Sequence, residues 1–281
     1  MSPLAPLQQL ALVSETSKLA FGELARVSAA LQKQGSRDLG PIWGLRATCD
    51  AFAKLEDVPV DYWPIIVRDD IGVSGAAGVH EDDSGHPFAL VQFDGGWSLT
   101  ASHEMCEMLC DPMGNTVRAG QSPKKGQQRV EFLVEVVCDP SEAAEFGYAV
   151  NGVSVSDFYT PHYFDPAEVA GVRYSFTGAI KKPRQVLKGG YLSWHDPVTD
   201  RWFQQVFFGK KPAFRDLGKI TQSAKSIRRQ IYDVTQESFK PRKPSVKMAM
   251  LASGSLGRAT EAGAPRAARL HTQIDELLGK A

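Results

Sequence analysis

The sequence has no long apolar run. No segment approaches the roughly 20 consecutive apolar residues that a membrane-spanning helix requires. The first segment, Met1 to Val13, is apolar but is interrupted by prolines and glutamines, and it lacks the basic start and small-residue cleavage site of a secretory signal. We therefore expect a protein that has no membrane segment and that resides in the cytoplasm.

Two further kinds of motif are absent. The four cysteines contain no CxxC pair, so in a reducing cytoplasm we expect free thiols and no disulfides. Glycines cluster between Gly72 and Gly78, but they match neither GxGxxG nor a phosphate-binding P-loop. Nucleotide binding therefore has little support in this sequence.

Neither sign of charge is in excess over the whole chain, which has 32 Lys and Arg against 32 Asp and Glu. From Leu217 onward, however, twelve basic residues face five acidic ones, which gives this part a net charge of +7. Such a tail can bind nucleic acid, but it is more often a solvated extension, and we expect no nucleic-acid partner. The composition after Lys240 predicts a flexible linker, and His271 to Leu278 predicts a short helix that docks on the body or on a partner.

The length and composition are those of an ordinary globular protein, with 281 residues of which 43% are hydrophobic and 23% charged. The spacing of apolar residues predicts a helix over Thr16 to Gln34. Buried strands are predicted at Tyr62 to Val67 and at Pro87 to Phe93. The turn Asp94-Gly-Gly-Trp97 then leads from the second strand into another helix.

This second helix contains His103, Glu104 and Glu107 in an HExxE arrangement. Residues four apart lie on one face of an α-helix, about 6 Å from each other, so His103 and Glu107 can bind one metal ion. Glu104 lies one step round the helix, where it can reach a water molecule on that metal. The alternative is a surface helix, but such a helix usually carries Lys or Arg, and none occurs from Leu99 to Pro112.

The segment resembles the active-site helix of the zincin metallopeptidases, whose motif is HExxH. Thr100 three residues before His103, the uncharged neighbours and the closing hydrophobe Leu109 agree with the extended zincin pattern. Glu107 departs from it, so the resemblance is to an HExxE variant. The resemblance covers this helix and the strand before it.

The resemblance implies a zinc ion bound by His103, Glu107 and a third ligand, with Glu104 as the general base. It also implies that a peptide substrate pairs with the strand at residues 87–93 through main-chain hydrogen bonds. Two carboxylate ligands would offset the charge of Zn²⁺, which favours slow hydrolysis of a narrow range of substrates.

The third ligand has several candidates. Zincins of the glutamate class take it from a glutamate downstream of the motif, with a supporting aspartate a few residues later. We predict a strand over Arg129 to Asp139, in which Glu135 and Asp139 match these two places. Asp111 lies about 12 Å along the helix from His103, which favours a supporting or capping role. The other candidates for the ligand are Asp111, Asp139, Asp157 and His162.

Two β-hairpins are predicted, at Tyr148 to Phe158, where Asn151-Gly152 forms the turn, and at Tyr191 to Val206. Between them lies an aromatic segment with polar groups that can stabilise an oxyanion near a metal. The candidates for that catalytic role are Tyr159, His162 and Tyr163. An aromatic corner of the core is an equally good interpretation of this segment.

Together these patterns predict an α+β protein with a zincin-like mixed sheet, an active-site helix, additional β-hairpins and a flexible C-terminal tail. We expect an N-terminal helical segment at 1–40, a metal-binding catalytic domain at 41–215 and a basic extension at 216–281. The predicted function is that of a zinc-dependent peptidase of restricted specificity. Two alternatives stay open: a binding or scaffold protein with a structural metal or none, and a metalloenzyme with a carboxylate-rich iron or manganese site.

Overall fold

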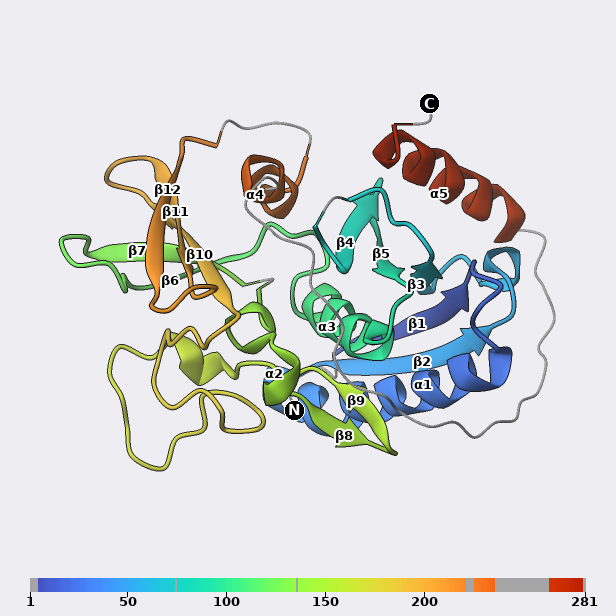
Figure 1. Cartoon of the computed structure of the whole chain (residues 1–281), viewed down its shortest axis with the longest axis horizontal. Helices are drawn as coiled ribbons and strands as arrows, with labels where there is room; N and C mark the ends of the chain where they lie inside the picture. The colour runs from blue at the N-terminus through green and yellow to red at the C-terminus, as the bar shows by residue number, and fades with distance from the viewer. Residues whose placement is uncertain (1–4, 74, 135, 221–224, 236–262, 280–281) are drawn as a thin grey trace.

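Two five-stranded sheets form the framework of the computed structural model, which describes residues 5–73, 75–134, 136–220, 225–235 and 263–279 (Figure 1). Helices pack on the first sheet, and the second sheet lies beside this helix-covered lobe (Figure 1). The fold class is α+β, as the sequence predicts. No helix in the described part of the chain is both long and apolar enough to cross a membrane.

The first sheet is mixed and has the strand order β2-β1-β3-β5-β4. Its strands are β1 (Leu7–Ser14), β2 (Arg46–Phe52), β3 (Trp63–Arg68), β4 (Gly78–Asp83) and β5 (His86–Gln92). The first three and β5 are parallel, whereas β4 runs antiparallel to β5 and forms the edge. Because β5 is paired on both sides, the prediction that residues 87–93 offer a free edge to a substrate is wrong.

Helices cover both faces of the first sheet. They are α1 (Phe21–Lys33), a π-helical continuation (Gln34–Leu39), α2 (Gly40–Trp43), α3 (Trp97–Cys110) and α5 (Gly263–Leu277). Because side chains alternate along a strand, Leu10 and Leu12 of β1 pack on the side of α1 and α3, and Ala11 and Val13 pack on the side of α5. This burial on both faces explains the apolar runs of the interior strands β3, β5 and the second half of β1.

The second sheet is antiparallel, with the strand order β12-β11-β10-β7-β6. Its strands are β6 (Val117–Gln121), β7 (Arg129–Leu133), β10 (Tyr191–Asp196), β11 (Arg201–Val206) and β12 (Ala213–Gly218). A separate hairpin pairs β8 (Tyr148–Val150) with β9 (Val153–Val155), and its turn residues Asn151 and Gly152 both have positive φ, as the Asn-Gly signal requires. Both predicted hairpins are therefore confirmed. Short 3₁₀ helices occur at Leu55–Asp57, Asp139–Ser141, Ala144–Phe146 and Pro161–Phe164.

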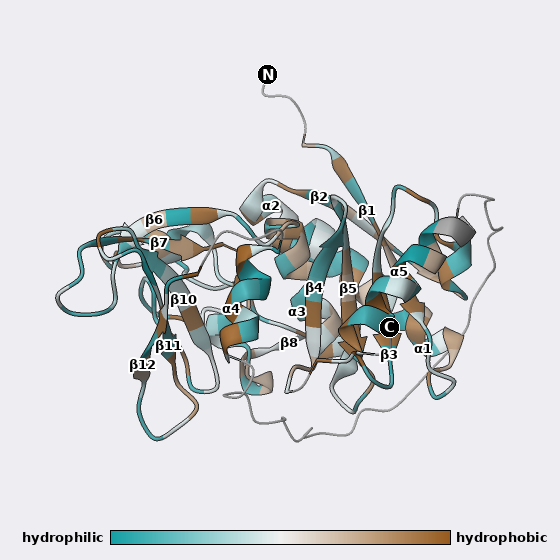
Figure 2. Ribbon diagram, turned by 90° about the horizontal axis from the view of Figure 1, so that it is seen from above, coloured by the Kyte–Doolittle hydropathy of each residue, from teal (hydrophilic) through white to brown (hydrophobic). Residues whose placement is uncertain are grey.

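The described part of the basic C-terminal segment packs on the body. Helix α4 (Ile227–Thr235) lies between the two sheets (Figure 2), where Arg229 forms an ion pair with Glu81 of β4. Helix α5 buries Ala267, Leu270 and Ile274 against the first sheet, which confirms a docked terminal helix that is longer than predicted. The predicted flexible linker falls largely on residues 236–262, which lie outside the described residues.

Two predicted elements have different bounds in the structure. The N-terminal helix begins at Phe21, since Thr16 is held in the preceding loop by a hydrogen bond from its hydroxyl to Asp69. The strand predicted over 129–139 ends at Leu133, after which Val134 donates a backbone hydrogen bond to Thr116 and the chain turns toward α3. The segment 1–40, which we set apart in the sequence, supplies β1 at the interior of the first sheet.

We expect Gly78→Ala to destabilise the protein by about 1–3 kcal/mol, because overpacking of a buried site costs this much. A Cβ atom at Gly78 would lie 2.5 Å from Oε1 of Glu104 and 2.6 Å from Cγ2 of Thr100, so these two side chains would have to shift or β4 would have to move away from α3. Urea denaturation measures the change. Gly209→Ala is the control, since its Cβ would meet nothing within 4 Å; equal stability of the two variants would contradict the close packing.

Candidate metal centre

Helix α3 holds the HExxE residues in the interior between the two sheets. Its apolar side, which includes Ala101, Met105 and Met108, is fully buried against the core. The carboxylates on the other side are also buried, Glu104 being 5% exposed and Glu107 0%. Buried carboxylates exclude the alternative of an ordinary solvated helix face, because such groups are stable only when paired or bound to a cation.

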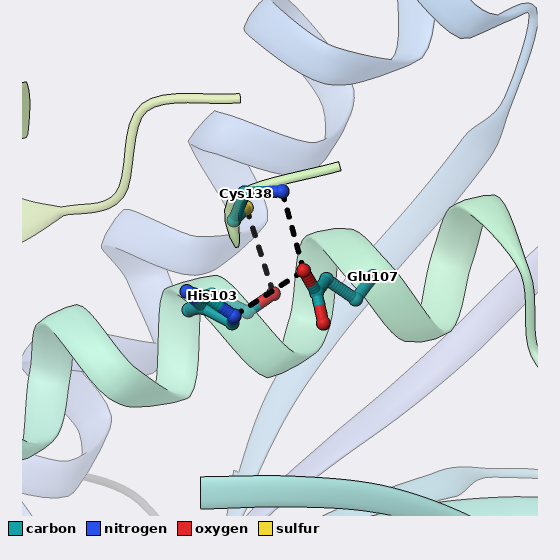
Figure 3. A group of neighbouring side chains, drawn as sticks. All are labelled: His103, Glu107 and Cys138. Atoms are coloured by element: carbon teal, nitrogen blue, oxygen red, sulfur yellow. Dashed lines mark hydrogen bonds and ion pairs between the residues drawn. The ribbon is translucent and has the colours of Figure 1, made fainter. Parts of the chain in front are cut away.

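His103 meets two carboxylates from different parts of the chain. Its Nε2 atom lies 3.2 Å from Oε1 of Glu107, one turn along α3, and 3.2 Å from Oδ1 of Asp139. Asp139 begins the 3₁₀ helix that follows β7. The backbone N–H of Cys138 donates to Oε1 of Glu107 at 3.2 Å and fixes that carboxylate (Figure 3). Sequence analysis gave Asp139 both as a supporting residue and as an alternative third ligand, and the structure places it in direct contact with His103.

Glu107 and Asp139 each reach His103, but their oxygens do not belong to one group of ligand atoms within 4.8 Å of one another, so a shared metal ion would draw the two carboxylates together. Ligands at about 2.0–2.2 Å from a tetrahedral zinc are about 3.3–3.6 Å apart, close to the two 3.2 Å separations at His103. Nitrogen and carboxylate oxygen are also donor types that zinc accepts. The other oxygen of Glu107, Oε2, is buried and has no hydrogen-bond partner among the described residues.

The net charge of the cluster also favours the binding of a divalent cation. Arg228 lies near Glu104, Glu107 and Asp139, and its positive charge favours the ionised carboxylates, although burial opposes their ionisation. Three ionised carboxylates, one arginine and a neutral His103 leave two negative charges, which a divalent cation would neutralise. Without it, protons take its place: burial raises the pKa of Glu104 to about 8 and, together with the charge of Asp139, raises that of Glu107.

The acidic groups around His103 shift its pKa upward. Burial lowers its pKa, but the negative charge of Glu107 and the hydrogen bond to Asp139 outweigh burial and hold the pKa well above the ordinary value. For Asp139, burial raises the pKa, but the positive charges of Arg228 and His103 outweigh burial, so that the pKa is lowered overall. A metal ion would therefore have to displace a proton from His103, so that its binding depends on pH.

Cys138 is a further group close enough to be considered as a ligand. Its Sγ lies near both His103 and Glu107. However, the thiol donates to the backbone carbonyl of His103 at 3.8 Å, and burial raises the pKa of this thiol well above its usual range (Figure 3). A metal binds the thiolate, so Asp139 is the better third ligand.

Glu104 faces a second histidine that sequence analysis missed. His80, on β4, has its Nε2 atom 3.1 Å from the backbone carbonyl of Asp111. A carbonyl only accepts, so Nε2 carries the proton, and the unprotonated Nδ1 lies 3.9 Å from Oε2 of Glu104. The sequence signal that could have placed His80 near the motif helix is the turn at Ser84-Gly85. This turn joins β4 and β5 into a hairpin and so brings His80 beside α3.

The remaining predicted site residues lie elsewhere. Asp111 organises the turn after α3, where its carboxylate accepts hydrogen bonds from the backbone of Asn115 and from Thr116, and these contacts do not reach His103. Asp157 accepts a hydrogen bond from the backbone of Thr177 and is not part of the cluster. Glu135, the predicted third ligand, lies outside the described residues.

The predicted oxyanion-stabilising residues do not reach the cluster. The hydroxyl of Tyr159 is buried and donates to the backbone carbonyl of Val134 at 3.0 Å, and Tyr163 donates likewise to the carbonyl of Gln185. His162 is on the surface, 2.8 Å from Asp165. Catalytic roles for Tyr159 and His162 are therefore wrong, and the interpretation as an aromatic corner holds.

A cavity of about 620 Å³ opens onto the cluster. It is lined by His103, Glu104 and Asp139 on one side and by Tyr191 and Arg228 on another. Arg228, from α4, donates to the Tyr191 hydroxyl at 2.9 Å and lies 3.6 Å from Oδ2 of Asp139. Sequence analysis missed both residues, because no local pattern links α4 or β10 to the motif helix.

Comparison with known proteins gives no relative: the chain matches no protein-family model, no curated protein and no solved structure. The function of the site therefore has to be argued from its geometry.

The burial of His80 predicts a loss of stability in acid. Burial lowers its pKa from 6.5 to about 3, so the unfolded chain binds a proton in this range that the folded protein does not. Stability then falls as the pH drops below 6.5, by at most about 1.4 kcal/mol per pH unit from this group. The advantage of wild type over His80→Gln should be constant above about pH 7.5 and should shrink in acid.

Urea denaturation of the metal-free proteins between pH 8 and pH 4.5 measures this difference. His86→Gln, which changes an exposed histidine at the start of β5, is the control. A difference between wild type and His80→Gln that does not change with pH would contradict a neutral buried His80.

Proposed function

We propose that this protein is a zinc-dependent peptidase of restricted specificity. The observation that carries the proposal is the meeting of His103, Glu107 and Asp139 at the wall of a cavity, with Glu104 beside them. The first three are the proposed metal ligands, and Glu104 is the proposed general base. The zincin resemblance of α3 supports the assignment, as does the mixed sheet whose edge strand β4 lies against α3.

The chemistry divides between the metal and the chain. A zinc ion in this site would act as a Lewis acid and would lower the pKa of a bound water molecule to about 7. Glu104 accepts the proton of the attacking water and then donates it to the leaving amine. His80 lies beside Glu104, with its Nδ1 atom 3.9 Å from Oε2, and helps to shield this carboxyl group from water. Tyr191 and Arg228 hold Asp139 in position from the opposite side.

The substrate-binding strand in this proposal is β4 rather than the predicted strand at 87–93. As the edge strand, β4 has one side that is not paired within the sheet. Residues Gly75 to Gly78, which lead into β4, line the cavity together with Glu104. A peptide that extends this edge by main-chain hydrogen bonds would place its carbonyl group near the metal ligands.

The metal ligands predict a pattern of zinc content. We expect one zinc per chain in the wild type and in Glu104→Gln, and loss of zinc in Glu107→Ala and Asp139→Ala. Removal of a ligand should weaken binding by at least about tenfold, since even outer partners of a metal site have effects of this size. Plasma mass spectrometry of the purified proteins measures the content.

Glu131→Ala is the matched control, because Glu131 pairs with His195 and does not belong to the cluster. Zinc that persists in Asp139→Ala would contradict Asp139 as a ligand. Loss of zinc in Glu104→Gln would make Glu104 a ligand, as in the neighbouring group of His80, Glu104 and Glu107, and would remove it as the base.

The role of Glu104 predicts the activity of the same variant. In a screen with fluorogenic peptide libraries, Glu104→Gln should lower kcat by about 10²- to 10⁴-fold, because that is the usual contribution of a general base. Its zinc content should be unchanged. Equal activity of the two zinc-loaded proteins would contradict the mechanism, and no cleavage of any peptide by the wild type would favour a binding protein.

A further inference from the structure

The far side of the cavity carries a second cationic group. Arg215 lies on β12, the edge strand of the second sheet, and lines the same cavity as His103 and Glu104. Its Nη1 atom is shielded from solvent and has no hydrogen-bond partner among the described residues. The residue as a whole is only partly buried at the cavity wall, and a guanidinium has several N–H donors, so Arg215 has donors left for a ligand in the cavity.

The neighbouring cations differ from Arg215 in having carboxylate partners. On the adjacent strand Arg201 pairs with Asp216 at 3.0 Å, and Lys219 pairs with Asp200 at 3.0 Å. The residue directly across from Arg215 in the sheet is Gln204, which is neutral. Within the described part of the chain, neither the sheet nor α4 gives Arg215 a counter-ion.

The cavity is of a size that lets one ligand contact both sides. Its volume of about 620 Å³ is within the range of about 300–1,000 Å³ typical of sites that enclose a drug-sized molecule. Phe208 and Tyr232 line the wall as well and supply apolar surface. A short peptide that reaches the metal ligands with its backbone can therefore also reach Arg215.

We propose that Arg215 is a subsite for a carboxylate group of the peptide that binds in this cavity. A guanidinium group binds a carboxylate through two parallel hydrogen bonds, and shielding from solvent strengthens them. The carboxylate is either the C-terminus of the peptide or an acidic side chain near the bond that is cleaved. The inference rests on the proposed function in taking the bound peptide to be the substrate. The preference for a carboxylate does not itself require catalysis.

Isothermal titration calorimetry with the zinc-loaded Glu104→Gln protein tests the subsite. Three acetylated tripeptides serve as probes: an alanine tripeptide amide without a carboxylate, the same peptide with a free C-terminus, and the amide with a central glutamate. At least one of the charged peptides should bind at least about tenfold more tightly than the neutral amide, as expected for a charge-assisted pair. The charged peptide that is preferred identifies the source of the carboxylate.

Substitution of Arg215 decides whether this residue is responsible. Arg215→Gln should abolish the preference, and Arg215→Lys, which keeps the charge but not the fork, should retain part of it. Lys211→Gln removes an exposed charge just before β12 and should leave the preference intact. Unchanged zinc content and circular dichroism verify the fold, and Arg215→Lys serves if Arg215→Gln does not fold.

Two results would overturn the inference: equal affinity of the three peptides for the protein with Arg215 intact, or a preference that survives in Arg215→Gln. The second would point to the metal or to Arg228 as the anion site. A carboxylate preference that depends on Arg215 in a protein that cleaves no peptide would sustain the subsite and refute the peptidase.

Discussion

The burial of carboxylates beside α3 is the constraint on which the rest of the site depends. The apolar side of this helix is needed for the core under the first sheet, and β4 packs so closely on the helix that a Cβ atom at position 78 would displace Thr100 or Glu104. Glu104 and Glu107 are thereby held away from water. Their negative charge has to be compensated by protons, by Arg228 or by a metal ion, because isolated buried charge is not stable.

The same charge balance explains the C-terminal segment. The basic surplus that begins at Leu217 matches the acidic surplus of the preceding residues, and the described helices use it for contacts with the body. Arg228 forms an ion pair with Asp139, and Arg229 forms one with Glu81. Arg269 of α5 forms an ion pair with Asp83. The expected solvated extension is therefore wrong for α4 and α5. Their positive charge lies against Asp139 of the carboxylate cluster and forms ion pairs with the edge strand β4.

Local patterns were enough to predict the parts of the site that lie on one element. The HExxE spacing places His103 and Glu107 in contact because four residues make one helical turn, and the Asn-Gly turn fixes the β8–β9 hairpin. The apolar runs at 62–67 and 87–93 are strands because the first sheet is covered on both faces.

The parts that depend on tertiary structure could not be predicted in this way. The alternating segment after Arg129 continues past the end of β7, and only the turn at Val134 decides that Asp139 arrives at His103. Likewise, the composition of β5 would suit an edge strand or an interior strand. It is interior because β4 folds back and pairs with it. Arg228 and Tyr191 are brought to the cluster from segments far along the chain.

The anomalous diffraction of a crystal of the zinc-loaded protein, measured at the zinc absorption edge, tests the metal centre most directly. We expect a single strong peak within about 2.0–2.2 Å of Nε2 of His103 and of carboxylate oxygens of Glu107 and Asp139, with Glu104 outside the coordination sphere. A peak between His80, Glu104 and Glu107, or no peak at α3, would contradict the account.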